Sequence, residues 1–194
     1  GTTDVEEEIR NNDVVFTVGK GTITVRDAAK SDMTITVIGA TNNDILSANT
    51  YTAEGIISEG KIVLPTTQKK SYTQGNNTSI VDGSKVKDGV QIIGNDSGGT
   101  LLGGEGKDTL ISGTGDFELV GDKGNDIFIF GGGKDTIFDY SQKGAGGSDK
   151  VSINSSLTAT GYEIDGDDVI LNYGDGNELM ILDGKGKEIT FAAK

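Results

Sequence analysis

A nine-residue period over residues 94–138 limits the possible folds of this chain more than any other feature of its sequence. The segment divides into five consecutive units: GNDSGGTLL, GGEGKDTLI, SGTGDFELV, GDKGNDIFI and FGGGKDTIF. The last two positions of every unit are large and apolar, and the first six are rich in Gly and Asp. Self-similarity at a fixed period indicates a solenoid, in which each unit stacks on its neighbours.

The units predict an all-β fold in which short strands alternate with tight turns. Glycine permits the positive φ angles and the close backbone approach that tight turns need. We find no segment with the composition of a helix, because Gly-rich and β-branched sequence disfavours one. The apolar eighth residue of each unit is expected to point into a narrow core; these residues are Leu101, Leu110, Leu119, Phe128 and Ile137.

The unit resembles the nonapeptide GGxGxDxUx of repeats-in-toxin (RTX, hemolysin-type) proteins, where U is a large apolar residue. Residues 103–111 match this pattern at every defined position. The resemblance covers residues 85–194 and implies a parallel β-roll, a form of β-solenoid. Two units would complete one coil, so each turn would stack on the turn of the next unit but one. The turns that begin at Gly103 and Gly121 would therefore share one edge.

The resemblance also implies that Ca²⁺ binds between stacked turns, through Gly-rich backbone carbonyls and Asp carboxylates. Ca²⁺ takes about 6–8 oxygen ligands in flexible geometry, whereas Mg²⁺ demands a tighter octahedron. On one edge the ligand set is complete. On the other it is weaker, because Phe117 occupies the sixth position of its unit, where the pattern has Asp, and Asp116 lies one residue before that position. A third candidate uses the turn that begins at Gly121. We therefore expect two or three ions. The predicted ligands are Gly104, Gly106, Asp108, Gly121, Lys123 and Asp126 for the first site; Gly113, Gly115, Phe130, Gly132 and Asp135 for the second; and Asp122, Gly124 and Asp126 against Asp139 for the third.

The charge of the chain fits cation binding. Thirty Asp and Glu residues against 17 Lys and Arg give a formal net charge of −13. Such a surface repels nucleic acid and anionic lipid, and no run approaches the ~20 apolar residues of a membrane span. We therefore expect no nucleic-acid partner and no membrane span. Taken alone, the charge is equally compatible with an acidic surface that aids solubility.

Missing residue types remove several kinds of catalysis. The chain has no His and no Cys, which excludes Ser-His and Cys-His nucleophile pairs and zinc sites built on these ligands. A carboxylate pair for glycoside cleavage stays open, but 30 acidic residues form close pairs by chance, so no pair is nominated. We expect a protein that is not an enzyme.

A longer repeat links the two ends of the chain. Residues 8–21 resemble residues 163–176 and, after one inserted residue, 23–27 resemble 179–183. We predict a β-hairpin cap at 13–27 and another at 168–183, the second covering the C-terminal end of the solenoid, because an open end is an unpaired edge. The duplication indicates neighbouring tandem modules in a longer protein. Chance similarity of two amphipathic hairpins is the alternative.

These patterns predict three parts: an N-terminal β region (1–75), a calcium-binding β-roll (76–140) and a C-terminal β cap (141–194). Residues 39–84 receive no role. The predicted function is a non-catalytic, calcium-binding structural module of an exported bacterial surface protein or adhesin, which folds in extracellular calcium. Two alternatives stay open: the secretion tail of a type I-secreted enzyme such as a protease or lipase, and a glycan-binding domain.

Overall fold

The computed structural model describes residues 5–18, 21–26, 29, 33–38, 45–52, 55–58, 60–64, 71–75, 78–142 and 148–191. The chain forms two compact units, Gly1–Val63 and Leu64–Lys194. The described residues are strands, turns and loops, with only short 3-10 turns such as Gly174–Gly176, which confirms the all-β prediction. A search of this part of the chain for a helix able to cross a membrane finds none.

The first unit consists of antiparallel strands. A three-stranded sheet is followed by four strands that pair in succession. The predicted hairpin at 13–27 is present as far as Val25, and Asp27 lies outside the described residues. The strands are β1 (Val5–Arg10), β2 (Asp13–Val18), β3 (Gly21–Val25), β4 (Met33–Ile38), β5 (Ile45–Thr52), β6 (Gly55–Ser58) and β7 (Lys61–Val63).

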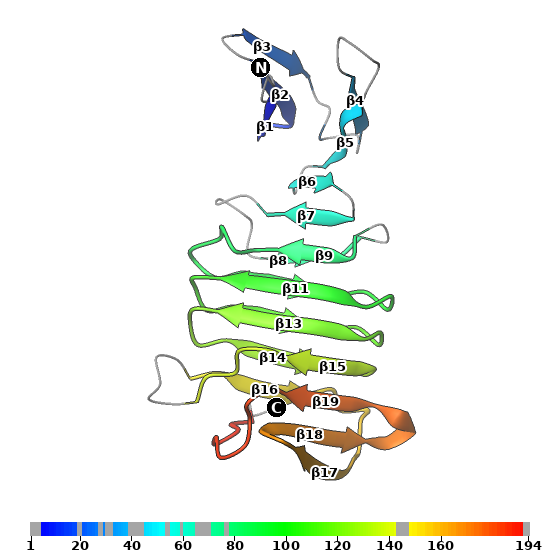
Figure 1. The fold of residues 1–194 in the computed structure, drawn as a ribbon, viewed down its shortest axis with the longest axis vertical. Helices are drawn as coiled ribbons and strands as arrows, with labels where there is room; N and C mark the ends of the chain where they lie inside the picture. Colours follow the sequence, from blue (N-terminus) through cyan, green and yellow to red (C-terminus); the bar gives the residue numbers. More distant parts are fainter. Residues whose placement is uncertain are drawn as a thin grey trace. The chain divides into compact units, whose positions relative to one another are not determined.

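The second unit is a parallel β-roll with two stacks of short strands, which confirms the predicted β-solenoid (Figure 1). Neighbouring strands are parallel throughout both stacks. One stack contains β8 (Ser71–Thr73), β10 (Gln91–Ile93), β12 (Thr109–Ile111), β14 (Ile127–Phe130) and β16 (Lys150–Ile153). The other contains β9 (Ile80–Asp82), β11 (Gly99–Gly104), β13 (Phe117–Asp122) and β15 (Lys134–Ile137).

The strand register reproduces the predicted coil of two units. Leu101 pairs with Leu119 in one stack, and Leu110 pairs with Phe128 in the other. All five of the predicted inward residues, Ile137 included, are at most 1% exposed. Since burying a large apolar side chain stabilises a fold by about 1.5–3 kcal/mol, this narrow file of residues supplies much of the roll's core.

The roll begins before the regular repeat. β8 pairs with β10 and β9 with β11 through coils that are longer than two units, from Ser71 to Gln91 and from Ile80 to Thr100. At the other end, β14 pairs with β16 through a coil that is longer still, from Ile127 to Lys150. The structure therefore places Ser71 and Ile80, in a segment to which the sequence assigned no role, inside the roll.

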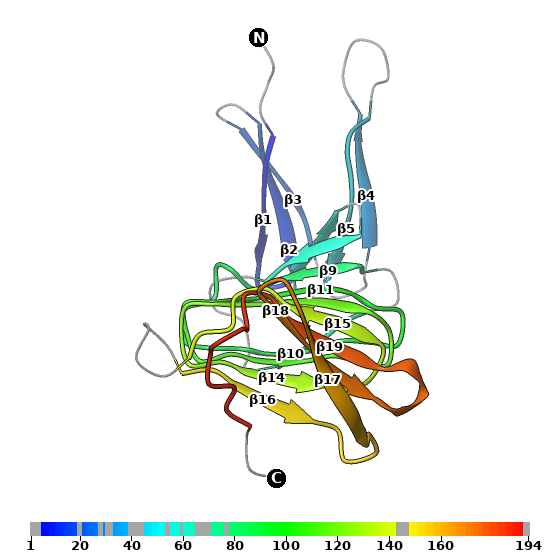
Figure 2. The same cartoon turned by 60° about the horizontal axis from the view of Figure 1, so that its bottom comes forward.

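An antiparallel meander closes the C-terminal end of the roll (Figure 2). It consists of β17 (Ala159–Asp165), β18 (Asp168–Tyr173) and β19 (Glu178–Ile181). β19 pairs in parallel with β15, so the hairpin predicted at 168–183 lies on the end of its stack. Every residue of β17 is exposed, and the cap therefore moves the unpaired edge from β15 to β17.

Candidate metal site

Buried aspartates form a ladder along the first edge of the roll, immediately before β12, β14 and β16. Asp108, Asp126 and Asp149 are each at most 3% exposed. In each carboxylate, Oδ1 accepts a hydrogen bond from a backbone N–H of the preceding coil. The donors are Val90 for Asp108 (2.7 Å), Asp108 for Asp126 (2.8 Å) and Asp126 for Asp149 (2.8 Å). The ladder therefore ties four successive coils together.

The second carboxylate oxygens of the ladder are not equivalent. Asp108 Oδ2 accepts a hydrogen bond from Gly104 N (2.6 Å), and Asp149 Oδ2 accepts one from Ser141 N (2.7 Å). Asp126 Oδ2 is buried and has no hydrogen-bond partner. Because an unpaired buried carboxylate oxygen is costly, Asp126 Oδ2 is the oxygen of the ladder at which a bound cation is most favoured.

Other carboxylates increase the negative charge around Asp126. Burial is the main cause that raises the pKa of Asp126 to about 7; the charges of Asp149, Asp108 and Asp139 add to this rise and the Asp108 N–H opposes it. Burial also raises the pKa values of Asp108 and Asp149. A bound cation would offset this repulsion and favour the ionised carboxylates.

Asp139 joins this group as the sequence predicted. Its Oδ1 accepts a hydrogen bond from Gly121 N (2.9 Å) and its Oδ2 accepts one from Asp122 N (2.6 Å). The structure thus brings Asp122 and Asp139, two residues of the third predicted site, together at the start of the turn that contains Gly124.

The two turns of the first predicted site are in close backbone contact. The Gly104 carbonyl accepts a hydrogen bond from Lys123 N (3.1 Å). The Gly106 carbonyl lies so near Gly124 that a Cβ there would overlap it, and the φ of Gly124 is +149°. Only glycine suits this backbone angle and this approach. The repeat glycines are therefore needed for the stacking of turns.

A carbonyl and a carboxylate of the first predicted site also converge. Gly121 O and Asp108 Oδ2 lie 2.6 Å and 2.5 Å from the position that a Cβ at Gly103 would take. Within the described part of the chain, no three acidic side chains lie close enough together to hold a metal ion. An ion here would consequently need backbone carbonyls among its ligands, which Ca²⁺ commonly uses. The residues present fit that ion, since every donor is an oxygen.

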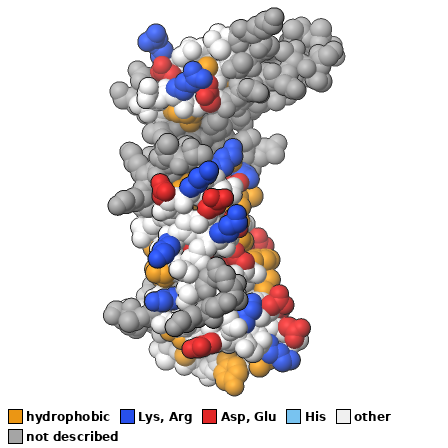
Figure 3. Space-filling view, turned by 90° about the vertical axis from the view of Figure 1, so that its left-hand side faces the viewer, with side chains coloured by type: hydrophobic (Ala, Val, Ile, Leu, Met, Phe, Trp, Pro, Cys, Tyr) orange, Lys and Arg blue, Asp and Glu red, His pale blue; other side chains and the backbone are white. Residues whose placement is uncertain are grey.

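Exposed acidic residues are a separate population. Lysines and acidic side chains lie intermixed along the face of the roll in Figure 3. Lys123 lies 3.5 Å from Glu105, and Lys134 lies 3.1 Å from Glu178. Exposed ion pairs of this kind contribute little to stability. Because lysines already pair with these carboxylates, the buried aspartates are the stronger candidates for metal ligands.

Asp149 is a member of the ladder that the nine-residue period missed. It accepts from Asp126 N at a spacing of 23 residues, whereas Asp126 accepts from Asp108 N at a spacing of 18. The intervening residues 143–147 lie outside the described part of the chain. A signal was nevertheless present, because Asp149-Lys150-Val151 repeats the Asp-x-apolar order of Asp126-Ile127-Phe128.

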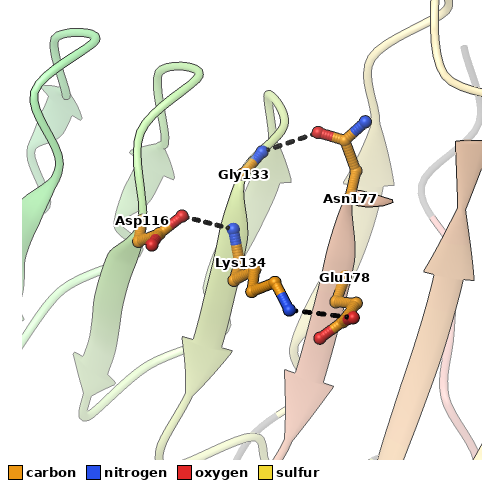
Figure 4. A network of polar contacts seen from close by, with 5 residues as sticks. All are labelled: Asp116, Gly133, Lys134, Asn177 and Glu178. Atoms are coloured by element: carbon orange, nitrogen blue, oxygen red, sulfur yellow. Dashed lines mark hydrogen bonds and ion pairs between the residues drawn. The ribbon is translucent and has the colours of Figure 1, made fainter. Parts of the chain in front are cut away.

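The second edge of the roll has an aromatic ring at the repeat position of Asp108 and Asp126. Phe117 is 2% exposed, and its ring packs against Gly94, where an added Cβ would lie 2.5 Å from the ring. Asp116 does not take over this position. Its Oδ1 accepts a hydrogen bond from Lys134 N at 2.8 Å (Figure 4). The difference between the two edges is therefore one of packing as well as of charge.

We expect Phe117→Ala to lower the free energy of unfolding by about 3–5 kcal/mol, since it empties a packed core position. The loss should be similar with calcium and with chelator, because the ring binds no ion. Denaturant unfolding in both buffers measures it. A loss confined to the calcium buffer would contradict the assignment of Phe117 to packing alone.

Asp135 is the buried carboxylate of the second edge. Its Oδ1 accepts a hydrogen bond from Phe117 N (2.9 Å), and its Oδ2 has no hydrogen-bond partner. Burial is the main cause that raises its pKa to about 7; the charge of Asp116 contributes to this rise, while the Ser112 hydroxyl and the Phe117 N–H oppose it. Asp135 therefore offers the second edge one candidate metal ligand.

The predicted carbonyl ligands of the second edge have close neighbours. The Phe130 carbonyl accepts a hydrogen bond from Asn154 N (2.9 Å). The Gly113 and Gly115 carbonyls each lie 2.5 Å from where a Cβ at Gly131 or Gly133 would stand. Gly132 lies beside Asn177 Oδ1, 3.2 Å from the position of an added Cβ.

Neutral amides link turns of the second edge. Buried Gln74 donates hydrogen bonds to Thr78 O (2.6 Å) and Gly98 O (3.1 Å) and accepts one from Asn95 N (3.0 Å). Asn177 Oδ1 accepts from Gly133 N at 2.8 Å (Figure 4). These contacts satisfy backbone groups of adjacent turns without an ion. The first edge, which carries the carboxylate ladder, is therefore the stronger candidate.

The pKa values predict how stability depends on pH when calcium is removed by chelating resin. Asp126 and Asp135 have pKa values of about 7 in the folded chain and an ordinary value of 3.8. Between these values the folded chain keeps protons that the unfolded chain releases, so the free energy of unfolding should fall as pH rises. Each group contributes up to about 4 kcal/mol. Thermal unfolding at about pH 5 and about pH 8 measures the effect, and greater stability at the higher pH would contradict it.

Comparison with known proteins assigns this chain to no family. No family model matches the chain, and no curated protein matches it. Among solved structures it is similar to the extracellular lipase LipA from Serratia marcescens, with a TM-score of 0.37 and 17% sequence identity. The match covers 100% of this chain and 31% of the lipase chain, so this chain spans about a third of the length of that structure. The assignment of the fold rests on the strands and their register.

Proposed function

We propose that this chain is a non-catalytic, calcium-binding structural module of an exported protein, and that its roll folds and becomes rigid when calcium binds along the first edge. The observation that carries this proposal is Asp126 Oδ2, which is buried and unpaired in a carboxylate whose pKa is raised by burial and by the charges of three other aspartates. Asp108 and Asp126, with carbonyls of the turns at Gly104 and Gly121, would hold an ion there. The ion would supply charge compensation and a cross-link between turns.

Calcium is favoured over other cations by the donor set. Carboxylates and backbone carbonyls are hard oxygen ligands, which exclude a preference for the softer transition metals. Mg²⁺ keeps several of its waters and demands a near-ideal octahedron, whereas Ca²⁺ accepts many protein oxygens in irregular geometry. With Asp135 on the second edge and Asp139 near Asp122, we expect two or three ions.

Coupling of calcium to folding follows from how little else stabilises the roll. Its coils bury two facing files of apolar residues between Gly-rich turns, and these turns lose much conformational entropy on ordering. Extracellular calcium modules bind at about 10⁻⁴–10⁻³ M, and at ten times its dissociation constant one site adds about 1.4 kcal/mol. Two or three sites would thus decide the folding of a marginal solenoid. This range of affinities suits a protein that folds where calcium is abundant, outside the cell.

A calcium titration followed by circular dichroism tests the proposal, with magnesium as the matched control. We expect the β-sheet signal to rise cooperatively in the millimolar range of calcium and to change little with magnesium at the same concentration. Asp167→Ala, which removes a carboxylate whose side chain is 82% exposed, should keep the calcium midpoint within about threefold of the parent. Equal β signal in chelator and in millimolar calcium would overturn the proposal.

A further inference from the structure

We propose that the β1–β3 sheet is the closing cap of another roll, and that the last strand of that roll pairs in parallel with the outer edge of β3. The occupant of this edge would be the C-terminal coil of a second module of the same kind. The basis is the β17–β19 cap of this chain. Its third strand, β19, lies next to the roll and pairs in parallel with β15.

The two sheets share one register in their first two strands. Glu8 pairs with Val15 and Ile9 with Val14 in β1–β2. In β17–β18, Glu163 pairs with Ile170 and Ile164 with Val169. Each residue of the second set lies 155 positions after its counterpart, for example 163 − 8 = 155. The sequence similarity of the two segments therefore extends to their strand pairing.

The third strands match after a shift of one residue. Phe16 pairs with Ile23 and Val15 with Thr24, as Leu171 pairs with Leu179 and Ile170 with Met180. The offset in the third strand is 179 − 23 = 156. The apolar residues Ile23 and Val25 thus stand at the places of Leu179 and Ile181, which are fully buried at the end of the roll.

The equivalence identifies the edge that a partner would use. Glu178 N donates to Gly133 O (2.9 Å) and Leu182 N donates to Ile137 O (3.0 Å) across the cap. By position, the N–H groups of Thr22, Thr24 and Arg26 occupy the outer edge of β3. In the described part of the chain, the sheet that contains β3 ends at this strand. An unpaired edge of this kind is a template for strand addition.

The two caps differ in polar side chains. Asn177 and Glu178 hold the last turn through Gly133 and Lys134 (Figure 4). Their counterparts in the N-terminal sheet are Gly21 and Thr22. The N-terminal cap would therefore hold its roll through the backbone ladder and apolar contacts, without the amide contact and the ion pair.

A cap exchange in the full chain tests this proposal. Residues 160–182 are replaced by residues 5–26, and a variant with 160–182 deleted shows the behaviour of an uncapped roll. We expect the exchange chimera to keep the cooperative thermal transition of the parent, and the deletion variant to lose it. All chains are compared in the same buffer, so the result stands whether or not calcium binds.

Single substitutions make the test specific to the edge. In the transplanted segment, Thr24→Pro removes the outward N–H and should abolish the transition, whereas Thr24→Val should keep it. Thr24→Pro at its natural position should leave the roll's melting temperature unchanged, because proline is tolerated on a free edge strand. A second chimera carries G21N and T22E, which restore the two polar contacts. If both chimeras melt like the deletion variant, or if Thr24→Pro at its natural position destabilises the roll, the proposal is wrong.

Discussion

Asp126→Asn should change the stability of the roll in opposite directions with and without calcium. In chelator at about pH 8 we expect the free energy of unfolding to rise by about 1–4 kcal/mol, because the substitution removes a buried charge. Asn is nearly isosteric with Asp, and its Oδ1 still accepts the hydrogen bond from Asp108 N, which is 2.8 Å long in the parent. The variant would thus keep the hydrogen bond of the ladder, while a neutral Nδ2 amide takes the place of the charged Oδ2.

In millimolar calcium the same variant should be less stable than the parent. It lacks a charged ligand, and we expect calcium affinity to fall by about tenfold or more, which is about 1.4 kcal/mol per factor of ten. Asp126→Ala is the comparator, because it leaves the Asp108 N–H unpaired at a cost of about 1–3 kcal/mol in both buffers. Denaturant unfolding of the parent, Asp126→Asn and Asp126→Ala in both buffers measures whether each free energy of unfolding rises or falls. If Asp126→Asn changes the free energy of unfolding in the same direction in calcium and in chelator, the result would contradict a metal role for the Asp126 carboxylate.

Asp149→Ala should release the last coil of the roll. The substitution removes the acceptor of Asp126 N and of Ser141 N, whose hydrogen bonds are 2.8 Å and 2.7 Å long. Leaving the buried Asp126 N–H unpaired costs about 1–3 kcal/mol, and the partly buried Ser141 N–H adds a smaller cost. We therefore expect loss of most of the calcium-loaded stability, with β16 as the first strand to exchange its amide hydrogens.

Hydrogen exchange in calcium, read residue by residue, measures this effect. The amides of Asp126 and Ser141 should lose protection before those of β12. Asp167→Ala is the matched control, because it also removes a carboxylate but from an exposed position. The Asp167 side chain is 82% exposed, and it forms an ion pair with Lys185 at 3.9 Å. Unchanged protection at Asp126 in the Asp149→Ala chain would show that the ladder does not fasten the last coil.

The regular part of the roll could be predicted from sequence because its period is fixed by geometry. Leu101 and Leu119 lie one coil of two units apart and are both fully buried, so the constant spacing marks the residues that face the core. β8 could not be predicted, since the coil from Ser71 to Gln91 is longer than two units and does not follow the nine-residue pattern. A long turn is tolerated at a surface loop, and it erases the period without changing the strand pairing.

The same reasoning separates the predicted and the missed parts of the candidate site. Asp108 and Asp126 were predicted because they belong to regular units, and the structure joins them by one hydrogen bond. Gln74 and Asn177 were not, because each reaches its turn from outside the repeat. The position of Phe117 was read as a missing ligand, but the buried ring shows that the second edge has apolar packing there.

The most direct test of the account is a crystal structure grown in calcium, with anomalous scattering measured at long wavelength. We predict an anomalous peak at about 2.3–2.6 Å from Asp126 Oδ2, with backbone carbonyls of the turns at Gly104 and Gly121 among its ligands. A well-ordered first edge in which Asp126 Oδ2 faces water or a protein donor, with no anomalous peak beside it, would contradict the central claim.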